Sequence, residues 1–484
     1  MTYTEYIETH EDELVGLLRD LIAFPSVLGD KKDGAPFGLV VNEAYDHMRK
    51  LAVDDGFSIF DADRYGGHIE WEGFIRDEVG EITAPAEEII GIPVHLDVVP
   101  AGEGWICDPF EGQYKDGLIY GRGTTDNKGS VAALYMAMKA LKNSGFEPEN
   151  TIRLILGLDE ETGSSGMDVY LEAAGMPDFG FVPDADFPAV RGEKGIIVFE
   201  LAKKLSKSNE TGLILRKIEG GNAANMVPDK ARAILMDEKN RDYSFIKDKI
   251  TAFREETGYK INGKGAGKAF EVTVHGVSAH AANPELGLNA ISILIKFLGS
   301  LELANESIRE FIDFYNSFIG FDLHGERMNI EFSDEHSGEL GLNTGLISMD
   351  SDVVILTINV RYPVTMNDSD VYDAIIPLIH KHDLGIVKGL LQPPIFFSED
   401  DPFLKTLIDI YRDETGDTES EAVVIGGGTY ARSFENMIAY GPRFPGNEDL
   451  MHQKDEYISK DDLVKMTHIY TKVLSKIAVR LNPE

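Results

Sequence analysis

The chain has 484 residues, of which 43% are hydrophobic, so it is long enough to bury a full core and to form two or three domains. Its 46 basic and 83 acidic residues give a formal net charge of −37, which argues against nucleic acid or an anionic membrane as a partner, because both require basic patches. One cysteine (Cys107), no apolar run long enough to cross a bilayer and no secretory-signal pattern at the N-terminus together predict a cytoplasmic protein.

The first 190 residues alternate between helix and strand patterns. Apolar residues at helical spacing predict a helix over residues 11–23, which Pro25 follows closely. Further patterns predict a helix over 42–55, strands within 58–71, strands over 89–96, 117–122 and 151–158, a helix opened by GTTDNKGS, a helix over 166–174 and a short strand before FVPDADFP. The 151–158 segment is nearly continuously apolar, as in a buried parallel strand. The order predicts an α/β domain with a mixed, mostly parallel sheet.

The pattern changes near residue 191. Alternating stretches at 269–274 and 352–361, with helices such as 284–301 between them, predict an α+β fold with antiparallel strands. The first pattern returns after PPIFFSED, with a helix over 402–415, a strand over 422–425 and a closing helix that Ser459 and Asp462 cap. We therefore expect a discontinuous catalytic domain of residues 1–190 and 395–484, with residues 191–394 forming an inserted domain.

Acidic and imidazole groups follow the predicted strands. His95 and Asp97 are two residues apart, so they share a strand face, and a carboxylate there would fix the tautomer of a metal-bound imidazole. In α/β sheets, sites gather beyond the carboxyl ends of the strands. The residues at such ends are His95, Asp97, Glu160, Glu161 and Asp184, and Asp126 and His452 lie in loops.

Two histidines with three carboxylates suit a pair of divalent ions such as Zn²⁺, Mn²⁺ or Co²⁺. Each ion would take one imidazole and one terminal carboxylate, while a third carboxylate bridges the ions. A spare carboxylate would serve as general base for hydrolysis. Adjacent Glu160 and Glu161 can supply both a ligand and a base, but their positions in the sequence do not decide which does which.

Five ordered motifs carry a family resemblance: HLDVVPAGEGW, YGRGTTDNKG, GLDEETGSSG, FVPDADFP and LMHQKDEYIS. They resemble the dinuclear zinc peptidase family of aminoacylase, carnosinase and carboxypeptidase G. The segments EGWICDPF, MPDFGFVPDADFP, RGEKG, NMVPD, GGGTYAR and FPGNEDLMHQKDEYIS are similar to those of its bacterial PepV-type dipeptidases, which include Xaa-His dipeptidases. The resemblance covers nearly the whole chain.

The resemblance implies a role for each site residue. The metal ligands would be His95, Asp126 (bridging), Glu161, Asp184 and His452; Asp97 would brace His95, and Glu160 would be the general base. The inserted domain resembles the family's lid. Within it, His280 in HGVSAHAANP would stabilise the oxyanion, while Asn225 in NMVPD and Arg361 in NVRYP would hold the substrate backbone and terminal carboxylate. The implied cofactor is two divalent ions, Zn²⁺ first, and the implied state is a monomer.

Two departures from the related sequences concern local tuning and substrate preference. Asn127 stands where related dipeptidases carry a second aspartate, and GSSGMD follows the acidic pair where bulkier residues are common. The sequence therefore predicts a metal-dependent dipeptidase that acts on small peptides with a free amino terminus. Two alternatives stay open: an N-acyl amino acid amidohydrolase or carboxypeptidase using the same site, and a non-catalytic binding protein on the same fold.

Overall fold

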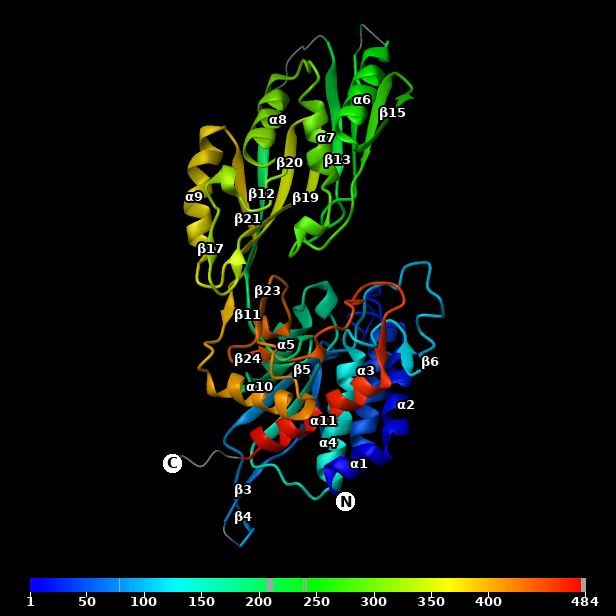
Figure 1. Ribbon diagram of the computed structural model, residues 1–484, viewed down its shortest axis with the longest axis vertical. Coiled ribbons are helices and arrows are strands. Elements are labelled where there is room, and N and C mark those ends of the chain that lie inside the picture. The colour runs from blue at the N-terminus through cyan, green and yellow to red at the C-terminus, as the bar shows by residue number, and fades with distance from the viewer. Residues whose placement is uncertain (78, 207–211, 238, 240–241, 480–484) are drawn as a thin grey trace. The chain divides into compact units, whose positions relative to one another are not determined.

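The computed structural model describes residues 1–77, 79–206, 212–237, 239 and 242–479. The chain divides into two compact units, the first formed by residues 1–191, 397–423 and 428–484 and the second by residues 192–396 and 424–427 (Figure 1). Residues 424–427, which the sequence pattern groups with the flanking segments, belong to the second unit. There the Lys194 N–H donates to the carbonyl of Ile425 at 2.9 Å, and Gly426 packs against Ala282.

The larger sheet, most of whose strands belong to the first unit, has the strand order β1-β2-β8-β5-β9-β24-β11-β22, with β23 beside β11. Its strands are β1 (Ser58–Asp61), β2 (Gly67–Trp71), β5 (Ile89–His95), β8 (Thr151–Gly157), β9 (Phe179–Val182), β11 (Val190–Glu193), β22 (Ile395–Phe396), β23 (Val423–Ile425) and β24 (Met437–Ala439). The chain passes between the units at β11, β22 and β23.

Strand direction varies across this sheet. The central run β8-β5-β9-β24 is parallel. The pairs β1–β2, β2–β8, β11–β24 and β11–β22 are antiparallel. The sheet is therefore mixed, as predicted, but its parallel pairs are confined to this central run and are not most of the described pairs. Two central strands approach closely at glycines: a Cβ on Gly180 would lie 1.8 Å from the carbonyl oxygen of Gly91.

The described residues of the first unit form seven α-helices: α1 (Tyr3–Thr9), α2 (Glu11–Ile22), α3 (Leu39–Asp54), α4 (Lys128–Asn143), α5 (Ser165–Ala174), α10 (Pro402–Thr415) and α11 (Lys460–Ile477). Helix α4 is buried along almost its whole length, because α1, α2 and α11 pack around it beside β5. Short 3-10 turns lie at Glu160–Thr162 and Tyr430–Ser433. Small sheets are formed by β3 (Phe74–Arg76) with β4 (Ile82–Pro85), by β10 (Ala185–Asp186) with β25 (Pro442–Arg443), and by β6 (Gln113–Lys115), β7 (Leu118–Tyr120) and β26 (Tyr457–Ser459).

The second unit is an eight-stranded sheet in which every recorded pair is antiparallel. Its order is β15 (Lys260–Ala266), β16 (Ala269–His275), β14 (Lys230–Met236), β13 (Ile214–Gly220), β19 (Gly341–Met349), β20 (Val353–Tyr362), β12 (Gly195–Lys204) and β21 (Gly385–Gln392). Helices α6 (Ser244–Thr257), α7 (Ala290–Leu298), α8 (Glu306–Phe318) and α9 (Asp368–Lys381) pack on it (Figure 1). A small hairpin joins β17 (Ser333–Asp334) to β18 (Gly338–Glu339), and a 3-10 turn lies at Glu326–Met328.

One predicted helix is shorter than expected. The 284–301 segment forms a 3-10 turn at Pro284–Leu286, and helix α7 begins only at Ala290. Asn289 caps α7 by accepting the N–H groups of Ile291 and Ser292, which fixes the start of the helix. None of the helices in the described part of the chain combines the length and the apolar composition that a membrane crossing needs.

Candidate active site

Three neighbouring parallel strands of the first unit end at one place. Strands β8, β5 and β9 lie side by side, with His95 in register with Gly157 at the end of β8. His95 is the last residue of β5, Glu160 and Glu161 follow β8 in a 3-10 turn, and Asp184 follows β9. Because parallel strands end at the same sheet edge, the predicted strand-end residues are brought together.

Asp126 lies between the two predicted histidine ligands. Its Oδ1 atom is 2.9 Å from His95 Nε2, and its Oδ2 atom is 2.9 Å from His452 Nε2. His452 Nε2 also lies 3.0 Å from Glu161 Oε2, and His95 Nε2 lies 3.6 Å from Asp184 Oδ2. One carboxylate therefore contacts two imidazoles that are 357 positions apart in the numbering.

The ligand-type atoms form two groups, each within 4.8 Å: His95, Glu160 and Asp184 in the first, and Asp126, Glu161 and His452 in the second. We call these the first group and the second group. Glu160, predicted as the general base, falls in the first group, and Glu161, predicted as a ligand, falls in the second. The adjacent glutamates thus belong to different groups.

Asp97 contacts both the histidine and the acidic turn. His95 Nδ1 is 2.9 Å from the backbone carbonyl of Asp97 and 3.5 Å from its carboxylate. A proton on Nδ1 would leave the Nε2 lone pair directed at the cluster. The Asp97 carboxylate accepts the backbone N–H groups of Glu160 (3.2 Å) and Glu161 (3.1 Å). Asp97 therefore holds the turn that carries one acid of each group.

Charges are crowded in this cluster. Burial, followed by repulsion from Asp184, raises the pKa of Glu160 well above its usual range, and burial with repulsion from Asp126 raises the pKa of Glu161. The histidines have the opposite effect on Asp126, because their hydrogen bonds outweigh burial and lower its pKa. Within each group the ligand-type oxygens of two carboxylates lie within 4.8 Å of one another. Carboxylates this close are stable together only with protons or a cation among them.

The cluster fits divalent cations. Glu161 Oε1 is a buried atom that makes no hydrogen bond, and an unsatisfied buried polar atom is costly. This oxygen and His95 Nε2, which faces the carboxylates of Asp126 and Asp184, are both metal donors. Imidazole nitrogen with carboxylate oxygen is a donor set that Zn²⁺, Mn²⁺ and Co²⁺ accept. Bound cations would satisfy these atoms and offset the repulsion between the carboxylates.

Two further residues of the cluster were not given a role from the sequence. Asn127 donates from Nδ2 to Asp184 Oδ1 (3.0 Å) and to the carbonyl of Pro183 (2.6 Å), and its Oδ1 accepts the N–H of His95 (3.3 Å). Glu456, inside the LMHQKDEYIS motif, is fully buried and binds the loop that carries Asp126. The only sequence signal for either residue was its position within a ligand-bearing motif.

Asn225, His280 and Arg361, the predicted substrate-contacting residues, lie in the second unit. Asn225 and His280 occupy two paired segments: the Asn225 carbonyl accepts the N–H of Ala281 (2.8 Å), and Met226 bridges to His280. Both side chains are exposed. Arg361 is 4% exposed; its Nε donates to Asn359 Oδ1 (2.9 Å) and its NH1 to the carbonyl of Gly426 (3.0 Å).

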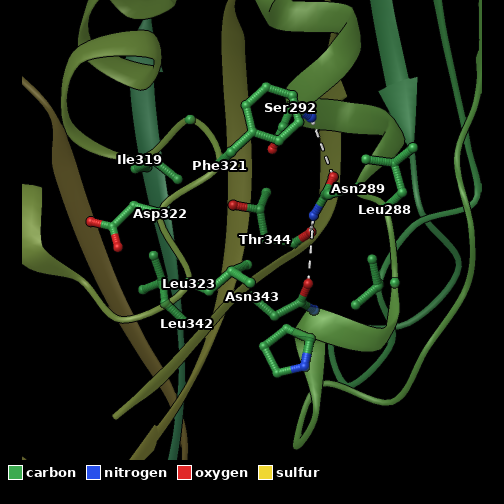
Figure 2. A pocket seen from close by; sticks show the side chains of 14 residues that line it. Leu288, Asn289, Ser292, Ile319, Phe321, Asp322, Leu323, Leu342, Asn343 and Thr344 are labelled. Carbon is green, nitrogen blue, oxygen red and sulfur yellow. Dashed lines mark hydrogen bonds between the residues drawn. The ribbon is translucent and has the colours of Figure 1, made fainter. Parts of the chain in front are cut away.

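Asn343 supports the segment that carries Asn225. This buried side chain donates from Nδ2 to the carbonyls of Ala224 (3.3 Å) and Met226 (2.9 Å), the two neighbours of Asn225. Figure 2 shows Asn343 beside Asn289, whose Nδ2 donates to the carbonyl of Thr344 (2.8 Å), at a cavity of about 90 Å³. The start of α7 is thus linked through β19 to the Asn225 segment.

Comparisons with known proteins agree with this architecture. Residues 91–476 match peptidase family M20/M25/M40. A protein of Staphylococcus epidermidis named "Putative dipeptidase" is 36% identical over 484 residues, which cover 99% of each chain. The fold resembles human carnosine dipeptidase 1 (TM-score 0.56, 17% identity, 98% of each chain covered) and the di-peptidase Dug1p of Saccharomyces cerevisiae (TM-score 0.56, 14% identity, 100% of this chain and 98% of the other). The chain therefore belongs to peptidase family M20/M25/M40.

Proposed function

We propose that this protein is a metal-dependent dipeptidase that hydrolyses dipeptides with a free amino terminus at a centre of two divalent ions. The observation that carries the proposal is the position of Asp126, whose two oxygens each lie 2.9 Å from a different histidine. A carboxylate placed in this way can bridge two ions. The name of the staphylococcal relative and the peptidase family support the reaction class.

The proposed ligands are His95 and Asp184 for one ion and Glu161 and His452 for the other, with Asp126 between them. When bound, the ions would supply Lewis acidity to the substrate carbonyl and to the attacking water. Glu160 is the proposed general base: burial and repulsion from Asp184 raise its pKa, which favours accepting a proton, and it would return the proton to the leaving amine. Asp97 is the proposed positioning residue for His95 and the Glu160–Glu161 turn.

We assign substrate contacts to three residues of the second unit. His280 is proposed to stabilise the oxyanion, Asn225 to hold the substrate backbone and Arg361 to bind the terminal carboxylate. A planar guanidinium suits a carboxylate because it can engage both oxygens. The pairing of the Asn225 and His280 segments supports a shared role for these two residues.

The remaining parts of the proposal concern the ion, the oligomeric state and the compartment. Zn²⁺ is the proposed native ion, with Mn²⁺ and Co²⁺ as alternatives, since the donor set accepts all three. We propose a monomer. A single cysteine, Cys107, supports a reducing, cytoplasmic environment.

The proposal is tested by a paired assay on metal-loaded enzyme. Release of the C-terminal amino acid is measured from a set of dipeptides and from the same dipeptides after N-acetylation. Cleavage of the free-amine set alone is the expected result. Cleavage of the acetylated set as well, or instead, would identify an N-acyl amidohydrolase or carboxypeptidase, and cleavage of neither would favour a binding protein.

The role of Glu160 is tested by Glu160→Gln. This variant is expected to keep both bound ions and to bind a dipeptide, while turnover falls by at least about 100-fold because the base is lost. Calorimetry with the metal and with a dipeptide measures the first two properties. Hydrolysis at the wild-type rate would show that another group accepts the proton.

A further inference from the structure

Glu456 is a buried carboxylate that accepts hydrogen bonds from a single loop. Its Oε1 atom accepts the backbone N–H groups of Thr125 (2.9 Å) and Asp126 (3.3 Å), and its Oε2 atom accepts Arg122 NH1 (2.5 Å). The N–H of Gly123 lies 3.2 and 3.1 Å from the two oxygens. Thr124 Oγ1 also donates to Oε1 (3.4 Å), so Glu456 accepts a hydrogen bond from each of the five residues from Arg122 to Asp126.

Arg122 balances the charge of Glu456 in the interior. The Arg122 side chain is fully buried, and its guanidinium lies 5.4 Å from the ring centre of Trp105. A buried carboxylate without a counter-charge is strongly unfavourable, so Glu456 and Arg122 depend on each other as a buried ion pair. Neither side chain belongs to the second group, and Glu456 contacts that group through the backbone N–H of Asp126.

The same two chain segments are joined by backbone contacts. Strand β26, which follows Glu456, pairs with β7, which precedes Arg122. The Gly121 N–H donates to the Glu456 carbonyl (2.9 Å), and Thr125 Oγ1 donates to the Tyr457 carbonyl (3.2 Å). The segment that carries His452 is therefore fastened to the segment that carries Asp126.

The two groups differ in how their residues are held. In the first group, the three segments follow strands β5, β8 and β9, whose ladder fixes their spacing, and His95 is fully buried. In the second group, His452 lies on a loop in a left-handed conformation (φ 63°), and its side chain is 51% exposed. The distance between His452 and Asp126 is not set by the larger sheet that contains β5, β8 and β9.

We propose that Glu456 is a positioning residue that fixes Asp126 and His452 at the separation needed to bind the ion of the second group. The inference rests on the proposed two-ion centre. Glutamine at position 456 keeps the shape but replaces one acceptor oxygen by an NH₂ donor, which would face either Arg122 or the N–H groups of Thr125 and Asp126. The loop would then relax away from the His452 segment.

The test is a calorimetric titration of metal-free protein with Co²⁺, for wild type and for Glu456→Gln. The visible absorption spectrum of the bound Co²⁺ is recorded in the same titration. We expect two equivalents to bind to the wild type. In Glu456→Gln the tighter equivalent is expected to change by less than about threefold and the weaker one to lose at least about tenfold, the range for residues that orient metal ligands. The visible spectrum of the Co²⁺ ion that binds second should also differ between the wild type and Glu456→Gln.

Glu70→Gln is the matched control. Glu70 also forms an ion pair with an arginine in this unit (Arg153, 2.8 Å), but its strand neighbours carry no ligand of either group. It should leave both binding steps unchanged. If Glu456→Gln does not fold, Thr125→Val carries the test: it removes only the hydroxyl contact to Tyr457 and should weaken the second step by about two- to fivefold.

The outcomes separate this inference from the proposed function. Two equivalents in the wild type with an unchanged second step in the Glu456→Gln and Thr125→Val variants would overturn the role of Glu456 and leave the two-ion centre standing. Equal weakening of both steps would also overturn it, because that is the result of a general loss of structure. A single equivalent in the wild type would overturn both proposals.

Discussion

Asp97 shows how one side chain can serve two segments of a site. Its backbone carbonyl is the nearer partner of His95, while its carboxylate is occupied by the N–H groups of Glu160 and Glu161. The sequence predicts a carboxylate beside the imidazole, but the period of a strand says nothing about what arrives from the next strand. The contact with the acidic turn follows from the parallel pairing of β5 with β8.

Asp97→Asn is expected to weaken metal binding by roughly 10- to 100-fold, the usual effect of removing a group that orients metal ligands. Asparagine at position 97 keeps one acceptor oxygen for the N–H groups of Glu160 and Glu161. Its own NH₂ group would face one of these two donors. Competition with a chelator measures the affinity. Asp159→Asn, which changes a carboxylate that holds Ser165 and Gly166 instead, is the comparison, and an unchanged affinity in Asp97→Asn would contradict the assignment.

Asn343→Leu should raise the KM for a dipeptide by roughly 5- to 50-fold, because the carbonyls of the two residues beside Asn225 lose their donor. Metal stoichiometry should not change, since no residue of either group lies in the second unit. Asn316→Leu, which removes a hydrogen bond to the Ile295 carbonyl in the same unit, is the control. A fall in kcat with an unchanged KM would argue against a role in substrate binding.

At the level of elements, periodicity predicts most helices and strands but not the direction of every strand. The helix patterns at 11–23 and 402–415 correspond to α2 and α10, and the apolar run at 151–158 corresponds to β8. The antiparallel pairs β2–β8 and β11–β22 could not be predicted, because the two strands of each pair lie far apart in the sequence and leave no local pattern. Helix α7 was predicted too long because the capping role of Asn289 was not recognised.

The pairing of β2 with β8 places Glu70 opposite Arg153, and this predicts a pH-dependent contribution to stability. Hydrogen bonds with His68 and Arg153 outweigh burial and lower the pKa of Glu70 to about 2 from the ordinary 4.5. A lowered pKa stabilises the folded state above the ordinary value, and the contribution is lost as the pH falls from about 4.5 towards 2.

Glu70→Gln should therefore lower the free energy of unfolding at pH 7 by about 1–2 kcal/mol, a figure reduced for partial exposure. The difference from the wild type should narrow between pH 5 and pH 3 by the same linkage. Urea unfolding at a series of pH values measures both. If the difference in the free energy of unfolding stays constant over this pH range, the substitution acts by changing the packing and not by removing the charge of Glu70.

At the scale of the whole molecule, the residues that the structure describes form two hydrophobic cores. One is built from residues of the first unit, around α4, β5, β8 and α11, and the other from residues of the second unit, around α7, α8, β19 and β20. Both metal-ligand groups belong to the first unit. Stabilisation by bound metal should therefore act on one core directly.

Calorimetric unfolding is expected to show two transitions, of which only one depends on metal. Removing the ions with a chelator should lower that transition by about 5–15 °C, since a ligand at 1,000 times its Kd stabilises by about 4 kcal/mol. The other transition should move by less than about 2 °C on the same scale. Equal shifts in both, or a single transition under every condition, would show that the units unfold together.

The discontinuity of the first unit also sets an order for synthesis. His95, Glu160 and Asp184 all belong to the first 191 residues, so every residue of the first group is synthesised before the second unit. The second group also needs His452, which is synthesised only after the whole of the 192–396 segment. An ion held by the second group therefore marks a polypeptide in which the 192–396 segment has already been synthesised.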